Sequence, residues 1–426
     1  MSNMELKNKK VLLMGLGILG GGVATAKWLL KQGAILTVTD LKDEKALEPS
    51  LKKLQEFESG IKFVLGKHEE KDFLDNDIIV INPDVPSKNH FVEMARKAGK
   101  QIENELTLFY KFAEFKTSIG VTGTRGKTTT TNWIGHILKN SGEKVIVLGN
   151  DPEKPFLSEI ENCTKETVVV IETPSFQLEI FGESGLAPHL SVITNIYQDH
   201  LSRHKTMEEY ALAKANIFKN QTEKDFLILN KNNQWTDFLL SLKPRAKVIF
   251  FVPEEDSPNL SASVVAAKTM GMSDIEVESA IPTLPSIPWR QEKVYDKGKL
   301  KIYNDTAATS PEATILALKH FPEAVFIVGG TDKELDFKEW AKVVNQNLKP
   351  ENLALLSGSA TEKMKKELGW DKFNEFENLE GCMGFALNQI GSEGVIVFSP
   401  GAKSFEKFKN EFDRGEKFNA IVNKML

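Results

Sequence analysis

The segment that most constrains this chain is residues 123–129, which read Gly-Thr-Arg-Gly-Lys-Thr-Thr. A short apolar stretch precedes it, and an apolar pattern of helical period, which Gly142 would end, follows it. The order strand, glycine loop, Lys-Thr, helix is typical of a phosphate-binding loop, where backbone N–H groups and a helix N-terminus meet the anion. The usual first glycine is absent because Val121 stands in its place, so the loop is a variant. We expect a nucleotide site, with Lys127 on the outer phosphates and Thr128 on Mg²⁺.

Short apolar runs alternate with helical patterns along the whole chain. Such runs are typical of parallel strands that are buried on both faces. They predict strands at residues 11–14, 35–40, 78–81, 145–148, 167–171, 191–194, 226–229, 301–303, 324–328, 353–356 and 395–398. Residues 282–288 contain three prolines and are interpreted as a linker. The expected fold class is therefore α/β with three domains: a Rossmann-like N-terminal domain at 1–100, a central P-loop ATPase domain with a mainly parallel sheet at 101–284, and a Rossmann-like C-terminal domain at 285–426.

The composition excludes several classes of protein. With 41% hydrophobic and 27% charged residues, the chain has the make-up of a globular protein. A net charge of −5 gives no basic footprint for nucleic acid or an anionic membrane. No apolar run approaches the ~20 residues of a membrane span, and the polar N-terminus has no signal-peptide core. The two cysteines, Cys163 and Cys382, give no disulfide framework. We expect a cytoplasmic monomer that binds neither nucleic acid nor membrane.

Three features near the predicted strand ends are candidates for chemistry. Glu172 ends the strongest central strand, where a carboxylate either holds Mg²⁺ or lies in solvent, and position alone leaves both open. Residues 195–204 place an aspartate, two histidines and an arginine close together, which favours function over a plain surface loop. Lys214 lies on an amphipathic helix, where spacing alone predicts a surface lysine.

A second glycine pattern supports a rival interpretation. Gly15-x-Gly17-x-x-Gly20, with Asp40 at the end of the next strand, also fits a dinucleotide fingerprint, which would make the chain an NAD(P)-dependent oxidoreductase. That alternative leaves the second nucleotide loop unexplained. A third interpretation is a non-catalytic ATP switch. A protein that only binds ATP would not need a second metal site, so this interpretation does not explain such a site.

Seven motifs, in the same order, resemble those of the Mur ligase family over nearly the whole chain. Residues 122–129 resemble the family loop TGTNGKTT, residues 172–179 resemble ExSSFQLE, and residues 195–204 are similar to NxxxDHLDRH. Tyr210 with Lys214 matches YxxxK, and residues 290–292 match most of HRxE. Residues 304–309 resemble NDSKAT, and residues 399–408 with 414–415 resemble SPAxASxDxF followed by RG. Within the family, the set is most similar to the members that add D-glutamate.

The resemblance implies an ATP-dependent, amide-forming ligase of peptidoglycan precursor synthesis, which adds D-glutamate to UDP-N-acetylmuramoyl-L-alanine through an acyl phosphate. It implies a catalytic set of Lys127, Glu172, His200 and Lys214, and two Mg²⁺ sites that use Thr128, Glu172, His200 and a carbamylated Lys214. ATP contacts are implied for Gly123, Thr124, Arg125, Gly126, Lys127, Thr128, Thr129, Asn259, Arg290 and Asp305. Substrate contacts are implied for Gly17, Ile18, Leu19 and Asp40 with the uridine diphosphate, for Asn150 and Ser175, and for Thr309, Lys333 and Ser404 with glutamate.

Several positions depart from the family pattern, among them Thr173-Pro174, which follow Glu172 in place of a serine pair. Ala307 replaces the lysine of NDSKAT, and Ala262 replaces an asparagine expected near adenine. Trp289 replaces the histidine before the motif arginine, and Arg125 replaces the loop asparagine. The departures spare the metal site and leave open whether the amino acid is D-glutamate, L-glutamate or another.

Overall fold

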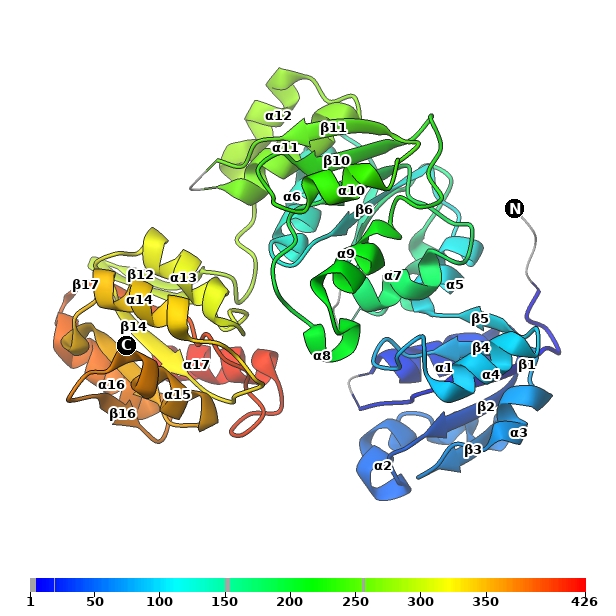
Figure 1. Ribbon diagram of the computed structural model, residues 1–426, viewed down its shortest axis with the longest axis horizontal. Helices are drawn as coiled ribbons and strands as arrows, with labels where there is room; N and C mark the ends of the chain where they lie inside the picture. Colours follow the sequence, from blue (N-terminus) through cyan, green and yellow to red (C-terminus); the bar gives the residue numbers. More distant parts are fainter. Residues whose placement is uncertain (1–4, 19, 150–153, 255–256) are drawn as a thin grey trace. The chain divides into compact units, whose positions relative to one another are not determined.

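The computed structural model describes residues 5–18, 20–149, 154–254 and 257–426. The chain divides into two compact units, residues 1–285 and residues 286–426. The first unit contains two sheets, here called the first and central sheets, and the second unit contains the third sheet (Figure 1).

The first sheet has five parallel strands in the order β3-β2-β1-β4-β5. The strands are β1 (Lys10–Met14), β2 (Ile35–Asp40), β3 (Ile61–Leu65), β4 (Ile78–Ile81) and β5 (Gln101–Glu103). The helices between them are α1 (Gly21–Lys31), α2 (Glu44–Lys52), α3 (Glu70–Asp75) and α4 (His90–Lys97), with a short 3-10 helix, η1 (Gln55–Gly60). The alternation of strand and helix gives this sheet its Rossmann-like character.

The central sheet has six parallel strands in the order β11-β10-β9-β6-β8-β7. The strands are β6 (Thr117–Thr122), β7 (Val145–Leu148), β8 (Val168–Glu172), β9 (Leu190–Ile193), β10 (Phe226–Asn230) and β11 (Lys247–Phe251). The helices are α5 (Glu105–Phe112), α6 (Lys127–Asn140), α7 (Ser175–Phe181), α8 (Leu201–His204), α9 (Met207–Ala215), α10 (Thr236–Ser241), α11 (Pro258–Thr269) and α12 (Asp274–Ala280), with η2 (Phe156–Asn162) and η3 (Ile281–Thr283) as 3-10 turns. Because β6 and β8 are neighbours, the loops that follow them open at the same edge of the sheet.

The third sheet has six strands in the order β12-β13-β17-β14-β15-β16. The strands are β12 (Glu292–Lys297), β13 (Lys299–Asn304), β14 (Val325–Gly329), β15 (Leu353–Leu356), β16 (Asn374–Phe376) and β17 (Glu393–Phe398). Only the β12–β13 pair is antiparallel. The helices are α13 (Pro311–His320), α14 (Lys338–Asn347), α15 (Ser359–Leu368), α16 (Leu379–Ile390) and α17 (Glu411–Met425), with η4 (Pro350–Asn352).

The uninterrupted apolar runs are explained by burial on both faces of each sheet. Successive residues of a strand point to opposite faces. Val11 and Leu13 of β1 therefore join one apolar core, and Leu12 and Met14 join another. The central strand β8 divides in the same way, with Val169 and Ile171 on one face and Val168 and Val170 on the other.

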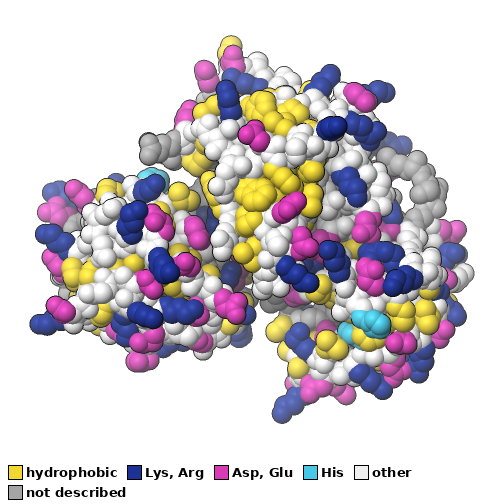
Figure 2. Space-filling model, in the orientation of Figure 1, with side chains coloured by type: hydrophobic (Ala, Val, Ile, Leu, Met, Phe, Trp, Pro, Cys, Tyr) yellow, Lys and Arg dark blue, Asp and Glu magenta, His cyan; other side chains and the backbone are white. Residues whose placement is uncertain are grey.

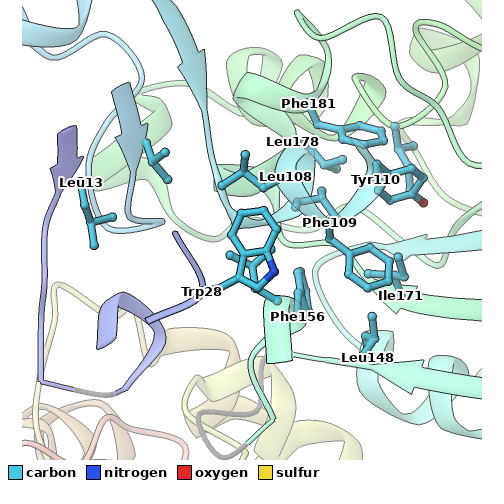
Figure 3. Close-up of a cluster of buried hydrophobic side chains, with 14 of the residues drawn as sticks. Leu13, Trp28, Leu108, Phe109, Tyr110, Leu148, Phe156, Ile171, Leu178 and Phe181 are labelled. Atoms are coloured by element: carbon cyan, nitrogen blue, oxygen red, sulfur yellow. The ribbon is translucent and has the colours of Figure 1, made fainter. Parts of the chain in front are cut away.

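One apolar core in the first unit includes residues of both sheets. Figure 3 shows Leu13 of β1 and Trp28 of α1 in one cluster with aromatic side chains of α5, α7 and η2. The ring centroids of Trp28 and Phe112 lie 4.9 Å apart in an edge-to-face arrangement. Each fully buried large apolar side chain contributes about 1.5–3 kcal/mol, so this cluster alone is a strong attachment between the two sheets.

The predicted α/β class with mainly parallel sheets is confirmed. Every predicted strand is present, with ends shifted by at most two residues. The sequence analysis missed β3, β5, β11, β12 and β16, because these are short or carry polar residues that interrupt the apolar pattern. The predicted domain boundaries at residues 100 and 284 stay predictions, while the division between the two compact units follows Pro285.

Within the described ranges, no helix combines the length and the apolar character that crossing a bilayer requires. On the face drawn in Figure 2, basic and acidic side chains are interspersed.

Candidate active site

The predicted phosphate loop joins β6 to α6 and is shaped by two glycines with positive φ, Gly123 at 150° and Gly126 at 78°. A Cβ atom on Gly123 would lie 1.9 Å from the Thr194 hydroxyl oxygen, and one on Gly126 would lie 2.0 Å from Asn259 Oδ1. Any other residue at either position would collide with these side chains. The positive φ values favour glycine at both positions, and a larger residue would also have to displace a neighbouring side chain. The contact also places Asn259, a predicted ATP residue, directly beside the loop.

Asn195 holds the phosphate loop in place from the end of β9. Its carbonyl oxygen accepts from the Thr124 N–H at 2.9 Å, and its Oδ1 accepts from the Arg125 N–H at 2.9 Å. Its Nδ2 donates to the Arg125 carbonyl oxygen at 3.1 Å. One asparagine side chain therefore satisfies backbone groups that would otherwise be free to adopt other loop conformations. The Arg125 side chain itself pairs with Asp199 at 2.9 Å.

Thr128 and Glu172 form the candidate metal position. Thr128 lies in the first turn of α6, Glu172 ends β8, and the Thr128 hydroxyl donates to Glu172 Oε2 at 2.6 Å. A hydroxyl and a carboxylate oxygen at a helix N-terminus beside a phosphate loop are ligands that suit Mg²⁺, so the residues present fit one ion. Lys127 Nζ donates to the Thr124 carbonyl oxygen at 3.2 Å, within the same loop. Among the described residues there is no cluster of three His, Cys, Asp or Glu side chains that could hold a metal by itself.

Lys214 lies on α9, and its side chain is 1% exposed. The surface position predicted from spacing alone is therefore wrong, because the amphipathic period does not reveal that the apolar side of α9 turns this lysine towards the phosphate loop. Lys214 Nζ donates to the Gly123 carbonyl oxygen at 2.8 Å and lies 4.5 Å from the Tyr210 ring centroid. Burial, followed by the positive charge of Lys127, lowers the pKa of Lys214 well below its ordinary value.

The loop that contains His200 has a strained backbone. His200 has a φ of 55°, and its N–H donates to Asp199 Oδ1 at 2.8 Å. Its ring centroid lies 6.0 Å from that of Tyr210, the aromatic residue that also contacts Lys214. The φ of His200 is uncommon for a non-glycine residue. His200 and Lys214 are therefore brought to one neighbourhood.

Ser175 is the first residue of α7, and its hydroxyl lies 3.0 Å from His204 Nε2. Both side chains are buried. Burial is the main cause that lowers the pKa of His204, which favours the neutral imidazole at this position.

In the first sheet, Asp40 ties together the two loops that were expected to bind nucleotide. Its Oδ2 accepts from the Gly17 N–H and its Oδ1 accepts from the Lys42 N–H, both at 2.9 Å. The Ser50 hydroxyl donates to the Gly17 carbonyl oxygen at 2.6 Å, and Ile18 is exposed. The predicted substrate residues Leu19 and Asn150 lie outside the described residues.

In the third sheet, Asp305 follows β13 and accepts two hydrogen bonds. The Ser399 hydroxyl donates to its Oδ2 at 2.7 Å, and the Gln291 N–H donates to its Oδ1 at 3.1 Å. Burial raises the pKa of Asp305 to about 7 in spite of these bonds. Arg290, the neighbouring predicted ATP residue, donates to the Pro288 carbonyl oxygen at 3.4 Å.

The three predicted glutamate residues lie on loops that follow strands of the third sheet. Lys403 Nζ donates to the Thr309 hydroxyl oxygen at 3.2 Å. Lys333 is exposed, and its Nζ lies 4.9 Å from the Phe405 ring centroid. The Ser404 hydroxyl is buried and has no hydrogen-bond partner in the part of the chain that the structure describes.

Several residues that shape the site are not among the predicted site residues. Asn195 and Tyr210 belong to quoted motifs, so their motif positions were the available signal. Arg414 is fully buried and donates to Thr306 and to the carbonyl oxygens of Ala402 and Lys403. Its RG motif gave no indication that the guanidinium joins two loops of the third sheet.

Comparisons with known proteins show which family this chain resembles. Residues 9–104 match the family model described as Mur ligase MurD-like, N-terminal domain, and residues 121–308 match the model described as Mur ligase middle domain. The chain is 34% identical to the UDP-N-acetylmuramoylalanine--D-glutamate ligase of Roseiflexus sp. (strain RS-1), over 98% of this chain and 99% of the relative. It is 34% identical to the enzyme of the same name from Borreliella afzelii (strain PKo), over 98% of both chains. The crystal structure of MurF ligase from Thermotoga maritima in complex with ADP aligns with a TM-score of 0.57 at 18% identity, over 99% of this chain and 97% of that one, which shows a shared fold.

Proposed function

The chain belongs to the Mur ligase family, and from this membership we propose that it uses ATP to join D-glutamate to UDP-N-acetylmuramoyl-L-alanine. The observation that carries the proposal is the convergence of Thr128, Glu172 and Lys214 on one phosphate loop at the edge of the central sheet. An amide-forming reaction driven by ATP requires such a site, and the relatives that match nearly the whole chain are named for this reaction.

The chemistry follows from the weak electrophilicity of a carboxylate. An oxygen of the alanine carboxylate attacks the γ-phosphorus of ATP, and the bond to the ADP oxygen breaks, which gives an acyl phosphate. The amine nitrogen of glutamate then attacks the carbonyl carbon and forms the C–N bond, the amine loses a proton, and inorganic phosphate leaves. Water would destroy the acyl phosphate, so the site must exclude it.

The phosphate loop supplies the charge that the phosphoryl transfer requires. Bound Mg²⁺ would neutralise negative charge on the phosphoryl group, as in other phosphoryl transfer enzymes. Thr128 and Glu172 fit the first ion, and Lys127 adds a positive charge from the first residue of α6. Asn259 would meet ATP beside Gly126. Arg290 and Asp305 would contribute further ATP contacts.

Lys214 would act as a carbamate, and His200 would join it at a second Mg²⁺. A neutral amine attacks CO₂ and loses one proton to form the carbamate, and a lowered pKa makes the neutral amine available near neutral pH. The product carries anionic oxygens, which suit a hard cation. The buried position of Nζ against the Gly123 carbonyl oxygen supports this role.

The two organic substrates would lie at separate sheets. The uridine diphosphate would meet Gly17, Ile18 and the loops that Asp40 ties together, with Ser175 nearer the central sheet. Glutamate would meet Thr309, Lys333 and Ser404. The unpartnered Ser404 hydroxyl supports this proposal, because a buried donor without a partner costs about 1–3 kcal/mol unless a ligand satisfies it. We expect a monomer that works in the cytoplasm.

An assay of ADP release tests the proposal. The purified protein is mixed with ATP, Mg²⁺, UDP-N-acetylmuramoyl-L-alanine and one amino acid at a time, and the product is identified by mass spectrometry. We expect ADP release that requires all components and is fastest with D-glutamate, and none from Lys127→Ala. A preference for L-glutamate would contradict the stereochemical assignment alone. Turnover of NAD(P) without ligation would favour the oxidoreductase alternative, which has no support among the relatives compared.

A further inference from the structure

Glu179 of α7 and Arg203 of α8 form a two-bond ion pair within the first unit. Arg203 Nε donates to Glu179 Oε1 at 2.8 Å, and Arg203 Nη2 donates to Glu179 Oε2 at 3.0 Å. The two side chains are only 16% and 13% exposed. Burial opposes ionisation of the carboxyl, yet the hydrogen bonds and charge of Arg203 lower the pKa of Glu179 below its ordinary value. The pair is therefore a charged contact held largely away from solvent.

Both members of the pair also bind the backbone of the loop that follows β4 of the first sheet. Arg203 donates from Nη1 to the Pro83 carbonyl oxygen at 2.8 Å and from Nη2 to the Val85 carbonyl oxygen at 3.1 Å. The Ser87 N–H donates to Glu179 Oε2 at 3.2 Å. A planar guanidinium can donate hydrogen bonds to a carboxylate and two carbonyl oxygens at once. A lysine ammonium cannot reproduce this planar arrangement of donors.

The bound loop is continuous with the nucleotide end of the first sheet. The Asn82 N–H donates to the Met14 carbonyl oxygen at 2.9 Å, so the loop begins beside the last residue of β1. The glycine turn that contains Gly17 follows directly. Residues 82–87 therefore connect the ion pair to the end of the first sheet where the uridine diphosphate is predicted to bind.

The other side of the pair is continuous with the phosphate-transfer end of the central sheet. Arg203 lies three residues after His200, and His204 Nδ1 lies 3.8 Å from Glu179 Oε1. The same His204 contacts Ser175. The apolar core shared by the two sheets attaches them, but apolar contact is not directional. The ion pair supplies directional contacts between these two ends.

Resting on the proposed function, we propose that Glu179 and Arg203 are positioning residues that set the distance between the bound uridine diphosphate and the carboxylate that becomes phosphorylated. A buried ion pair is weak evidence for stability, because apolar side chains of similar size often do as well. Bonds to three backbone groups of one loop instead fit a role in alignment. A displacement of about 1 Å between reacting groups costs up to about 10²-fold in rate.

Arg203→Lys and Glu179→Gln test the proposal with two acceptors. The full acceptor is UDP-N-acetylmuramoyl-L-alanine, and the short acceptor is N-acetylmuramoyl-L-alanine, which lacks the uridine diphosphate. We expect kcat/KM for the full acceptor to fall about 10–100-fold and kcat/KM for the short acceptor to change less than about twofold, because the short acceptor does not depend on alignment with the first sheet. The KM for ATP should stay at the wild-type value. Equal losses with both acceptors, or no loss with either, would overturn the proposal.

A titration with UDP alone separates alignment from damage to the first sheet. We expect each variant to bind UDP with the wild-type Kd while it uses the full acceptor poorly. Should the short acceptor turn over too slowly to measure, this comparison decides: a weakened Kd for UDP overturns the proposal, and an unchanged one supports it. Lys31→Ala is the matched control, because Lys31 forms an exposed ion pair with Glu161 between α1 and η2. Absence of ligation by the wild-type protein would count against the proposed function, not against the role of this pair.

Discussion

Lys214 Nζ lies 2.8 Å from the carbonyl oxygen of Gly123, the residue that opens the phosphate loop. This contact brings a buried amine of α9 to the site where ATP would bind, although the two residues are 91 positions apart in the chain. A free ammonium would repel Lys127 and Arg125 there, whereas an anionic carbamate would be attracted to them. The proposed carbamate would therefore fit the positive charge of its surroundings.

We predict that Lys214→Ala is nearly inactive and that acetate partly restores its activity. Acetate would supply the carboxylate oxygens that the carbamate places in the site, and we expect the variant to lose on the order of 10²-fold or more in kcat. Initial rates with and without acetate measure the rescue. A carbon-13 NMR signal of a carbamate in wild-type protein supplied with labelled bicarbonate, absent from the variant, is a second readout. Full activity of the variant without additives would exclude the role.

Lys127→Ala should abolish ATP turnover and leave the fold intact. Lys127 begins α6, and removal of one positive contact to the phosphates should cost on the order of 3 kcal/mol of transition-state stabilisation. ADP release measures the loss, and circular dichroism checks the fold. Lys139→Ala, near the other end of the same helix, is the control and should retain wild-type turnover. A Lys127 variant with wild-type rates would contradict the phosphate-loop assignment.

Lys333→Ala should raise the KM for glutamate far more than the KM for ATP. Lys333 offers an exposed ammonium beside Phe405, and charge-assisted hydrogen bonds are the strong ones available to a substrate with two carboxylates. Ser404→Ala should act in the same direction but less, because it removes a neutral donor. Initial rates over a glutamate series give both constants, and Lys342→Ala on α14 is an exposed control. A rise in the KM for ATP alone would place Lys333 at the nucleotide instead.

Glu105→Gln should stabilise the protein at pH 8 but not at pH 4.5. Burial raises the pKa of Glu105 to about 7 in the folded chain, and its Oε1 has no hydrogen-bond partner in the described structure. A raised folded-state pKa favours the protonated native form, so wild-type stability is greatest below the unfolded value and falls as the pH rises through about 7. The difference at pH 8 should be on the order of 3 kcal/mol. Denaturant unfolding at both pH values measures it, and parallel wild-type and variant curves would contradict the burial of this carboxyl.

The sequence predicted the parts of the fold that depend on local pattern. Apolar runs such as residues 168–171 reveal buried parallel strands because every residue of such a strand meets a core. The contacts that make the site cannot be predicted in this way. Asn259 fills the space beside Gly126, which is 133 residues earlier, and Arg203 meets the backbone of Pro83 and Val85. No local sequence pattern predicts either contact, because each contact exists only after the sheets have formed.

The pKa values of Lys214 and Asp305 are likewise not predictable from local sequence pattern. The family resemblance implies a role for each, but spacing says nothing of burial, and burial is what moves their pKa values. The backbone N–H of Ala307 donates to the Trp289 carbonyl oxygen at 3.0 Å, so two positions that depart from the family pattern lie against each other.

The order of strands in the third sheet determines when that sheet can form during protein synthesis. β17 lies between β13 and β14 and pairs with both. A nascent chain that has emerged only as far as α16 therefore contains the strands on either side of β17 but lacks β17 itself. The strands of the first sheet, in contrast, have all been synthesised by residue 103. Because domains fold as units while the ribosome is still translating, the first sheet can form early. The third sheet must wait for β17 and for the final helix with its buried Arg414, so a prematurely terminated chain would lack the sheet where we propose that glutamate binds.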